Sequence, residues 1–230
     1  KMYGNLGKVE NKGLDFSIDY VKRFNNDFDM SFKGTFTYAH NKVLEYDEPD
    51  FQKYPNISRV GHSVDQQLLY IAERLFIDDS EVQRNPKQNL GGWVSGGDIK
   101  YKNLPDVNGN YDNVIDSNDR QYTGMPTTPE IVYGFGPSFR YKKFDFSFFF
   151  QGAARVSIMM NGIHPFGAEG TRNVLQFIAD DYWSETNQNI YAEYPRLSKR
   201  DNENNTKAST YWQRNGAFLK LKNLEVGFNH

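Results

Sequence analysis

The chain has 230 residues, a formal net charge of −2 and no cysteine. This length suits one large domain or two small ones, and the near-neutral charge predicts no broad attraction to nucleic acid. The lack of cysteine excludes a disulfide framework and any cysteine-based metal or redox site. Aromatic residues make up 16% of the chain, and both β-strands and membrane interfaces favour such residues.

The first segment with a clear pattern is a predicted β-hairpin. Gly13–Phe24 leads into a turn at Asn25-Asn26-Asp27, and Phe28–Val43 returns. On the return strand, large apolar side chains occupy alternate positions: Phe28, Met30, Phe32, Phe36 and Tyr38. Successive strand side chains point to opposite faces, so the pattern predicts a sheet with one apolar and one polar face. A soluble β-sandwich and a transmembrane β-barrel both fit it.

The long connection after this hairpin is predicted to be loop with short elements. Gln66–Phe76 is ambiguous, because its apolar spacing fits a helix and its residue types also fit a strand. Asp78-Asp79-Ser80-Glu81 is similar to a capping box and predicts a short helix that ends before Pro86. Asp98–Asn103 predicts a short strand.

Oxygen-bearing side chains alternate in the next segment, and they are the candidate metal ligands: Asp106, Asn108, Asn110, Asp112 and Asp116. Calcium takes six to eight oxygen ligands, and an Asp-x-Asn-x-Asn opening supplies three of them from one tight loop. The run departs from the EF-hand pattern, since its glycine comes too early and no Glu stands at the twelfth position. A turn whose Asn and Asp side chains bond their own backbone explains the same residues. Both interpretations stay open.

A second hairpin is predicted from Ile131–Lys142 and Phe144–Gln151. Its last strand carries aromatic residues at four alternate positions, namely Phe144, Phe146, Phe148 and Phe150. Pro137 has no N–H to donate to a ladder, so it predicts a bulge or a strand edge.

The remaining elements follow in order. Thr171–Trp183 predicts a helix capped by Thr171, because its apolar residues fall on one stripe. Ser184–Ser209 is predicted to be a long polar loop. Ala217–Phe228 predicts a last strand, with a bulge near Leu221–Asn223 where the alternation changes face.

The connections differ in length between the two ends of the hairpins. The turns at Asn25–Asp27 and Lys142-Lys143 are very short, whereas the connections Leu44–Asn103 and Gly152–Gly216 are very long. Sandwich loops are usually short at both ends. Outer-membrane barrels have short periplasmic turns and long extracellular loops, so this asymmetry favours the barrel.

Several separated runs resemble segments of one known family, in the expected order. They are Val9–Asp15, Gly97–Lys102, Asp106–Asn110, Ile115–Arg120, Gly124–Pro126, Tyr133–Phe135, Phe144–Ser147, Phe150–Gly152, Tyr182-Trp183, Thr186-Asn187, Tyr194–Leu197 and Phe218–Phe228. The family is SusC/RagA, the TonB-linked outer-membrane transporters of Bacteroidetes. The family often has Asp where Asn110 stands, so the charge of the candidate calcium loop is weaker here.

The resemblance implies an all-β fold, an antiparallel transmembrane β-barrel segment whose long external loops carry short helices. Residues 1–230 would be the C-terminal portion of a barrel of the 22-stranded type, incomplete at both ends, with the plug domain elsewhere in the protein.

The implied function is import of a large nutrient, an oligosaccharide (glycan) or peptide, across the bacterial outer membrane. The implied partners are a SusD-like surface lipoprotein, outer-membrane lipid, and the TonB-ExbB-ExbD complex, contacted through an N-terminal region that this chain lacks. No nucleic acid and no enzymatic activity are expected. The competing interpretation is a soluble β-sandwich that serves as a carbohydrate-binding or adhesion module.

Three loop aromatics, Trp93, Tyr111 and Tyr122, are weak candidates for substrate binding. Aromatic rings in external loops can stack on sugar rings or line a peptide site. Ordinary packing within the loops is the alternative explanation for each of them.

Overall fold

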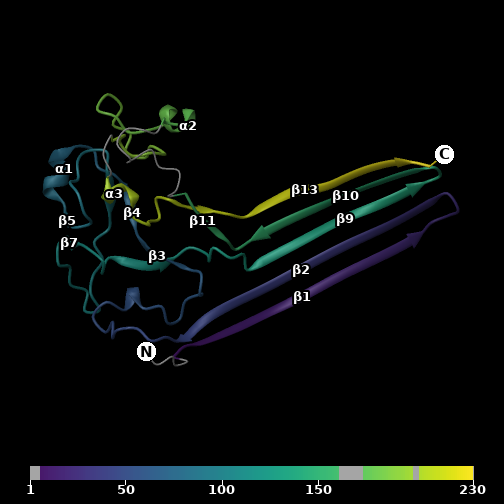
Figure 1. Cartoon of the computed structure of the whole chain (residues 1–230), viewed down its shortest axis with the longest axis horizontal. Helices are drawn as coiled ribbons and strands as arrows, with labels where there is room; N and C mark the ends of the chain where they lie inside the picture. The colour runs from purple at the N-terminus through teal and green to yellow at the C-terminus, as the bar shows by residue number, and fades with distance from the viewer. Residues whose placement is uncertain (1–5, 161–172, 199–201, 230) are drawn as a thin grey trace.

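The computed structural model describes residues 6–160, 173–198 and 202–229. Five long strands form one antiparallel sheet, here called the strand arm, in the order β1-β2-β9-β10-β13. Their bounds are β1 Lys8–Arg23, β2 Phe28–Glu45, β9 Ile131–Tyr141, β10 Phe144–Ala154 and β13 Phe218–Phe228. The arm projects from a body built by the connections between β2 and β9 and between β10 and β13 (Figure 1). We call this body, residues 46–130, 155–160, 173–198 and 202–217, the loop module.

Both predicted hairpins are present. The side-chain Oδ1 of Asn25 accepts hydrogen bonds from the backbone N–H groups of Asp27 and Phe28, each at 2.9 Å. This local bonding by an Asn side chain closes the first turn. In the second hairpin, Lys142 adopts a φ of 54°, in the left-handed region, and β9 and β10 pair directly on either side of it.

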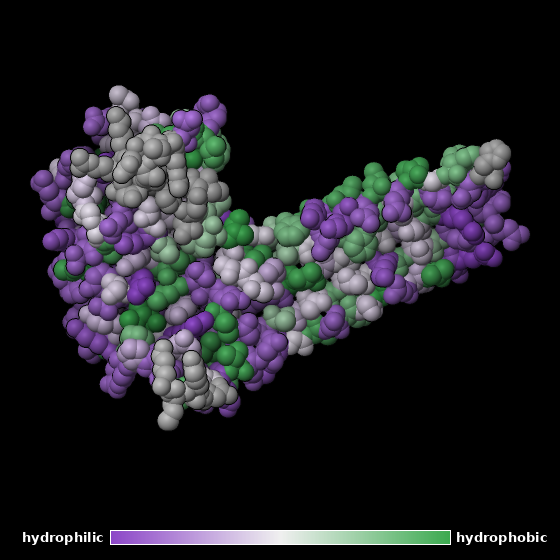
Figure 2. Space-filling view, in the orientation of Figure 1, coloured by the Kyte–Doolittle hydropathy of each residue, from purple (hydrophilic) through white to green (hydrophobic). Residues whose placement is uncertain are grey.

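The register divides the strand arm into one apolar and one polar face, because residues directly opposite each other in antiparallel strands share a face. One row across four strands is wholly aromatic: Phe28, Tyr141, Phe144 and Phe228. A row on the other face is wholly polar: Ser31, Ser138, Ser147 and Glu225. The predicted alternation is therefore confirmed. Figure 2 shows hydrophobic and hydrophilic residues side by side along the arm, and hydrophilic ones over much of the loop module.

One of the two predicted strand irregularities is present. Asn223 pairs with Phe149 and Leu221 with Phe150, so Lys222 is left over and forms the predicted bulge in β13. The prediction for Pro137 was wrong. Pro137 lies in β9, the middle strand of the five, and pairs in register with Phe32 of β2. No register shift accompanies it on the β10 side, where the ladder has no paired residues opposite Pro137 and Gly136.

The loop module contains many short elements. Its strands are β3 Gln67–Tyr70, β4 Ala72–Leu75, β5 Lys87–Gln88, β6 Ile99–Tyr101, β7 Val114–Ile115, β8 Arg120–Thr123, β11 Ser157–Met159 and β12 Gln213–Asn215. Its helices are η1 Pro55–Ile57, α1 Asp79–Arg84, α2 Gln176–Asp180 and α3 Glu203–Thr206. The strands pair in twos as β3-β8, β4-β6, β5-β7 and β11-β12.

The two long connections fold together into one body. The N–H of Tyr70 donates to the carbonyl of Ala208 at 3.1 Å, and the N–H of Thr210 donates back to the carbonyl of Tyr70 at 3.0 Å. Further along, the N–H of Leu75 donates to the carbonyl of Ile190 at 2.9 Å. The first connection therefore forms these three backbone hydrogen bonds with a segment that lies more than a hundred residues later in the chain.

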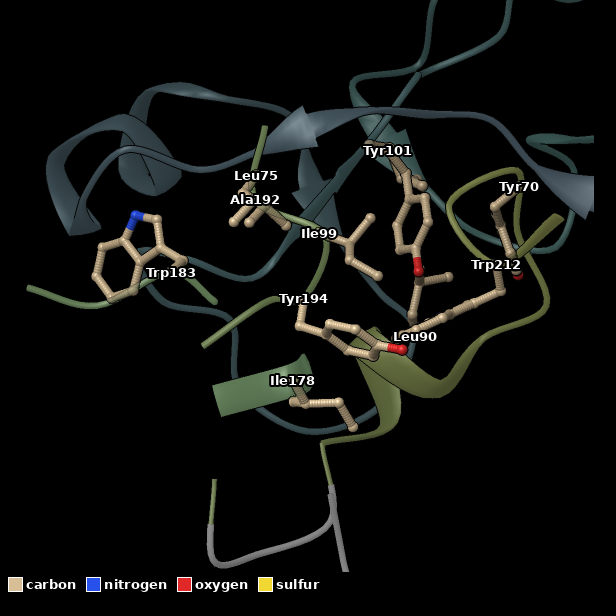
Figure 3. Packing of buried hydrophobic residues seen from close by; sticks show 11 residues of the cluster. Tyr70, Leu75, Leu90, Ile99, Tyr101, Ile178, Trp183, Ala192, Tyr194 and Trp212 are labelled. Atoms are coloured by element: carbon tan, nitrogen blue, oxygen red, sulfur yellow. The ribbon is translucent and has the colours of Figure 1, made fainter. Parts of the chain in front are cut away.

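The hydrophobic core lies in the loop module and draws on both connections (Figure 3). Its members are Tyr70, Leu75, Leu90, Ile99, Tyr101, Ile115, Ile178, Trp183, Ala192, Tyr194 and Trp212. The segments that the sequence presents as long loops thus fold around a core of their own.

The predictions for the short elements had mixed outcomes. Helix α1 begins as predicted, with Asp78 Oδ1 accepting from the N–H of Glu81 at 2.8 Å, and it ends before Pro86. The ambiguous segment Gln66–Phe76 forms strands β3 and β4. The helix predicted over Thr171–Trp183 was too long, because only Gln176–Asp180 is helical within the described part of it; its proposed cap, Thr171, lies outside the described residues. Across the described ranges, no helix is long and apolar enough to cross a membrane.

Candidate functional site

Trp93 stands on the surface of the loop module between β5 and β6. Its side chain is 60% exposed. The turn before it contains Gly91 and Gly92 with φ of 94° and 71°, and such positive values suit glycine because other residues clash there. The guanidinium of Arg196 lies over the Trp93 ring, 4.2 Å from its centroid. Trp93 is thus fixed on one side by a cation and open to solvent elsewhere.

Arg196 is itself held by a buried carboxylate. Asp98 is completely buried. Its Oδ2 accepts a hydrogen bond from Arg196 Nη2 at 3.0 Å, and its Oδ1 lies 2.7 Å from Arg196 Nε. Asn202 and Asn205 each donate to Asp98 Oδ1 at 2.9 Å. Burial raises the pKa of Asp98, while the guanidinium of Arg196 acts in the opposite direction. The Asp98 network therefore anchors the cation that stacks on Trp93.

Two hollows flank Trp93. The larger has a volume of about 500 Å³ and lies between the start of α1, the Trp93 turn and the segment from Trp183 to Gln188. The smaller, of about 340 Å³, lies between Trp93 and the segment from Val82 to Gln88. Trp183 packs in the wall of the larger hollow. Gly97 leaves room for its ring, because a Cβ at position 97 would lie 2.2 Å from Trp183 Cε3.

The structure does not bring the three candidate aromatics together. Tyr111 is exposed in the loop before β7, and Tyr122 is half-buried in β8, where it stacks on His62 with ring centroids 4.5 Å apart. Neither lines the hollows beside Trp93. Packing explains Tyr122, and Trp93 is the candidate that borders open space.

The side chains around Trp93 carried no clear signal in the sequence. Asp78 and Asp79 fit the start of a helix, which they form, and nothing in the sequence placed them beside Trp93. Glu185 and Gln188 belong to a segment that the sequence presents as a polar loop, and Arg196 belongs to the Tyr-Pro-Arg-Leu run. These residues meet only because the two connections fold together.

In the oxygen-rich loop, the carboxylates form local turns. Asp106 Oδ1 accepts from the N–H groups of Asn108 and Asn110, both at 2.9 Å, and these bonds lower the pKa of Asp106. Asp112 Oδ1 accepts from the N–H of Val114 at 3.0 Å, and Asp116 Oδ1 accepts from that of Asn118 at 2.8 Å. Among the described residues, no group of three or more His, Asp or Glu side chains is arranged to hold a metal ion. The loop has the geometry of self-bonded Asx turns, and calcium binding by Asp106, Asn108, Asn110, Asp112 and Asp116 stays a prediction.

No protein-family model matches the chain. TonB-dependent receptor P3 of Formosa agariphila is 28% identical over 231 residues, which cover 98% of this chain and 22% of that receptor. TonB-dependent receptor SusC of Bacteroides thetaiotaomicron is 23% identical over 236 residues, covering 100% of this chain and 21% of SusC. The chain therefore spans about a fifth of the length of the curated relatives it matches.

The fold has a counterpart among solved structures. A structure of the RagAB peptide transporter matches 97% of this chain and 23% of its own, with a TM-score of 0.62 and 20% sequence identity. A structure of the RagAB peptide importer in the "open-open" state matches with a TM-score of 0.60. The strand arm and loop module together therefore have the fold of part of this transporter.

These likenesses define the class first: the chain has the antiparallel strand fold of TonB-dependent outer-membrane transporters. Within that class, the resemblance to the SusC/RagA family predicted from the sequence is confirmed. The predicted location in the bacterial outer membrane is confirmed with the class.

Proposed function

We propose that the full-length protein containing this chain imports a large nutrient, an oligosaccharide or a peptide, across the outer membrane in a TonB-dependent manner. In this proposal the strand arm is late barrel wall, and the loop module lies on the extracellular side. The carrying observation is the continuous apolar face of the arm, which joins the loop module at one end and tight turns at the other.

The relatives support the proposed partners. RagAB is a peptide transporter, also called a peptide importer, and SusC is a TonB-dependent receptor. We propose that a SusD-like lipoprotein sits over the loop module and delivers the nutrient. Energy would arrive from the TonB-ExbB-ExbD complex through another part of the protein.

The soluble β-sandwich alternative gains no support from the described residues. A sandwich needs a second sheet packed over the first, and the other sheets of the described chain are two-stranded. The apolar face of the arm also carries strongly exposed side chains, including Val226 and Phe144. A lipid or neighbouring-strand environment suits this face better than water.

An uptake assay tests the proposal. The full-length gene would be expressed in its host with tonB intact or deleted, and accumulation of labelled oligosaccharides and labelled peptides would be measured. Accumulation of one nutrient class that needs both this gene and tonB is expected. Co-purification of a SusD-like lipoprotein with the tagged protein is expected too. Equal accumulation with and without tonB would contradict the proposal.

A further inference from the structure

The larger hollow beside Trp93 is acidic. Asp78, Asp79 and Glu185 line it, and the guanidinium of Arg196, which also lines it, is already bound to Asp98. Like charges that border one hollow without a free cation create a negative potential, which attracts a cationic group. The guanidinium groups of Arg84 and Arg196 partly offset this charge, because they act through space on Asp78 and Asp79 respectively. Three carboxylates line the hollow against the single guanidinium of Arg196, so an excess of negative charge remains.

Asp78 and Asp79 are ionised, and each has one carboxylate oxygen that accepts hydrogen bonds from the described residues and one that does not. Asp78 Oδ1 accepts from the N–H of Glu81 and the hydroxyl of Ser80, both at 2.8 Å, and these bonds lower the pKa of Asp78. Asp79 Oδ1 accepts from the hydroxyl of Ser95 and from the N–H of Gly96, which lowers the pKa of Asp79. Among the described residues, no protein group bonds the Oδ2 atom of either carboxylate.

A buried donor in the same wall lacks an acceptor. Trp183 is 6% exposed, and its indole Nε1 has no hydrogen-bond partner among the described residues. In Figure 3 the indole nitrogen of Trp183 points away from the other labelled side chains of the core. Leaving such a buried donor unpaired is unfavourable. A ligand that brings a carbonyl oxygen to this wall would give the indole N–H its missing acceptor.

The smaller hollow, on the other side of Trp93, is mainly apolar. Phe76, Val82, Pro86 and Val94 contribute to its lining together with Trp93. Hollows of this kind take up apolar side chains, because burial removes apolar surface from water. Trp93 thus separates an acidic hollow from an apolar one, and an extended ligand would cross it.

We propose that the two hollows form a binding subsite for a peptide in which a lysine or arginine adjoins an apolar residue. The basic side chain lies among Asp78, Asp79 and Glu185, and the apolar side chain enters the smaller hollow. A backbone carbonyl of the peptide accepts from Trp183 Nε1. The assignment rests on the proposed import function, since it names which peptides that site would select.

Two features favour a basic peptide over a neutral oligosaccharide, and a third disfavours a metal ion. A sugar would also stack on Trp93, but it has no charge to match three carboxylates and no side chain for a separate apolar hollow. A bare divalent cation is disfavoured, because the acids of the described chain form no group arranged to hold a metal. A peptide supplies a cation, a carbonyl and an apolar side chain together.

Binding measurements on the full-length protein in detergent test the subsite. The probe is a fluorescent hexapeptide with a central lysine-leucine pair flanked by glycines. The matched probe has glutamine in place of lysine, and maltohexaose serves as the neutral glycan. The variants are Glu185→Gln, which removes a carboxylate without a protein partner in the described chain, and Trp93→Ala. Asp47→Asn is the control, since Asp47 is an exposed loop acid outside both hollows.

The lysine probe is expected to bind about two- to fivefold more weakly to Glu185→Gln, as befits one solvent-exposed charge pair. Trp93→Ala is expected to weaken both peptides, whereas Asp47→Asn changes neither. Added salt should weaken the lysine probe and leave the glutamine probe nearly unchanged.

Two outcomes would overturn the subsite: equal affinity of Glu185→Gln and the unaltered protein for the lysine probe, or tight maltohexaose binding that Trp93→Ala abolishes while peptide binding persists. A failure of the import proposal would be seen in a different experiment, as uptake in cells that does not depend on tonB. The binding assay with purified protein does not measure uptake, so it tests the subsite alone.

Discussion

The strand arm and the loop module bury their apolar side chains in opposite ways. In the arm, Phe144 is 57% exposed and Val226 is 74% exposed. In the loop module, Trp212 and Tyr101 are buried almost completely. Burying a large apolar side chain contributes about 1.5–3 kcal/mol, so the module gains this energy from its own fold and the arm needs a surrounding apolar phase.

This difference shows where the chain can hold a site of fixed geometry. The module anchors its surface through polar groups as well as through its core: Gln88 Nε2 donates to Asn204 Oδ1 at 2.6 Å, and Tyr101 Oη donates to the carbonyl of Asn204 at 2.7 Å. Buried hydrogen-bond networks of this kind favour one arrangement of the groups that they join. Trp93 and its hollows therefore lie on a part of the chain that has a core and buried polar contacts of its own.

The largest effect is expected from Asp98→Ala, which removes the central carboxylate of the module. Arg196 would keep its charge without a buried partner, and Asn202 and Asn205 would each lose an acceptor. Breaking a buried ion pair from one side costs about 3–5 kcal/mol. Differential scanning calorimetry of the full-length protein should show the loss, together with faster proteolysis within the loop module.

The exposed acid Asp47 supplies the control for that experiment, and Asp47→Ala should leave both measurements unchanged. If Asp98→Ala behaves like Asp47→Ala, the module does not depend on this network. The loop module would then not be stabilised by its buried polar groups in the way that we contrast with the strand arm.

The next largest effect concerns the two faces of the arm. Phe146→Arg places a charge on the apolar face, whereas Ser147→Arg places the same charge on the polar face, opposite Glu225. A charged residue facing lipid costs about 2–4 kcal/mol near the bilayer centre. The yield of folded protein in the outer-membrane fraction should fall for Phe146→Arg and stay near normal for Ser147→Arg. Equal yields would mean that the apolar face does not meet lipid.

A smaller, pH-dependent effect is expected at the start of α1. Burial alone would raise the pKa of Glu81, but hydrogen bonds from Arg74, the Ile77 N–H and Lys100 outweigh it and lower this pKa to about 2. A carboxylate with a lowered pKa stabilises the fold fully above its unfolded pKa of about 4.5, and this contribution disappears as the pH falls towards 2. With solvent screening, the contribution is about 2 kcal/mol.

Pepsin cleavage measures this effect, because pepsin works across the relevant pH range. Glu81→Gln lacks the titrating group, so the unaltered protein should be cut more slowly than the variant at pH 4.5. The two rates should converge near pH 2. A constant ratio of rates between these values would contradict the role given to Glu81.

The strands were predictable because their sequence signal is local. Alternation with a period of two determines which side chains share a face. Asn25 indicates the first turn, because an Asn side chain bonds nearby backbone N–H groups. Pro137 misled the prediction, since its missing N–H was taken to exclude a central strand. In the structure, the β9–β10 ladder lacks paired residues there without changing register.

The loop module was not predictable in the same way, because its core joins segments that are far apart in the chain. Asn204 and Asn205 belong to a polar run that suggests a solvated loop, yet both are completely buried. Trp93 was identifiable as an aromatic residue in an external loop. The acids beside it were not, because Asp78 and Glu185 meet across a hundred residues of sequence.

The smallest effect is expected at Asp106, and it separates the two interpretations of the oxygen-rich loop. Asp106→Ala removes the acceptor for the N–H groups of Asn108 and Asn110, which should cost about 1 kcal/mol and raise local hydrogen exchange. Isothermal titration with calcium tests the metal prediction independently. Heat of binding that disappears in Asp106→Ala would establish a calcium site, since a turn held only by its own Asx bonds needs no ion. Identical calorimetric traces from both proteins, with the exchange change still present, would leave Asp106 as a turn residue alone.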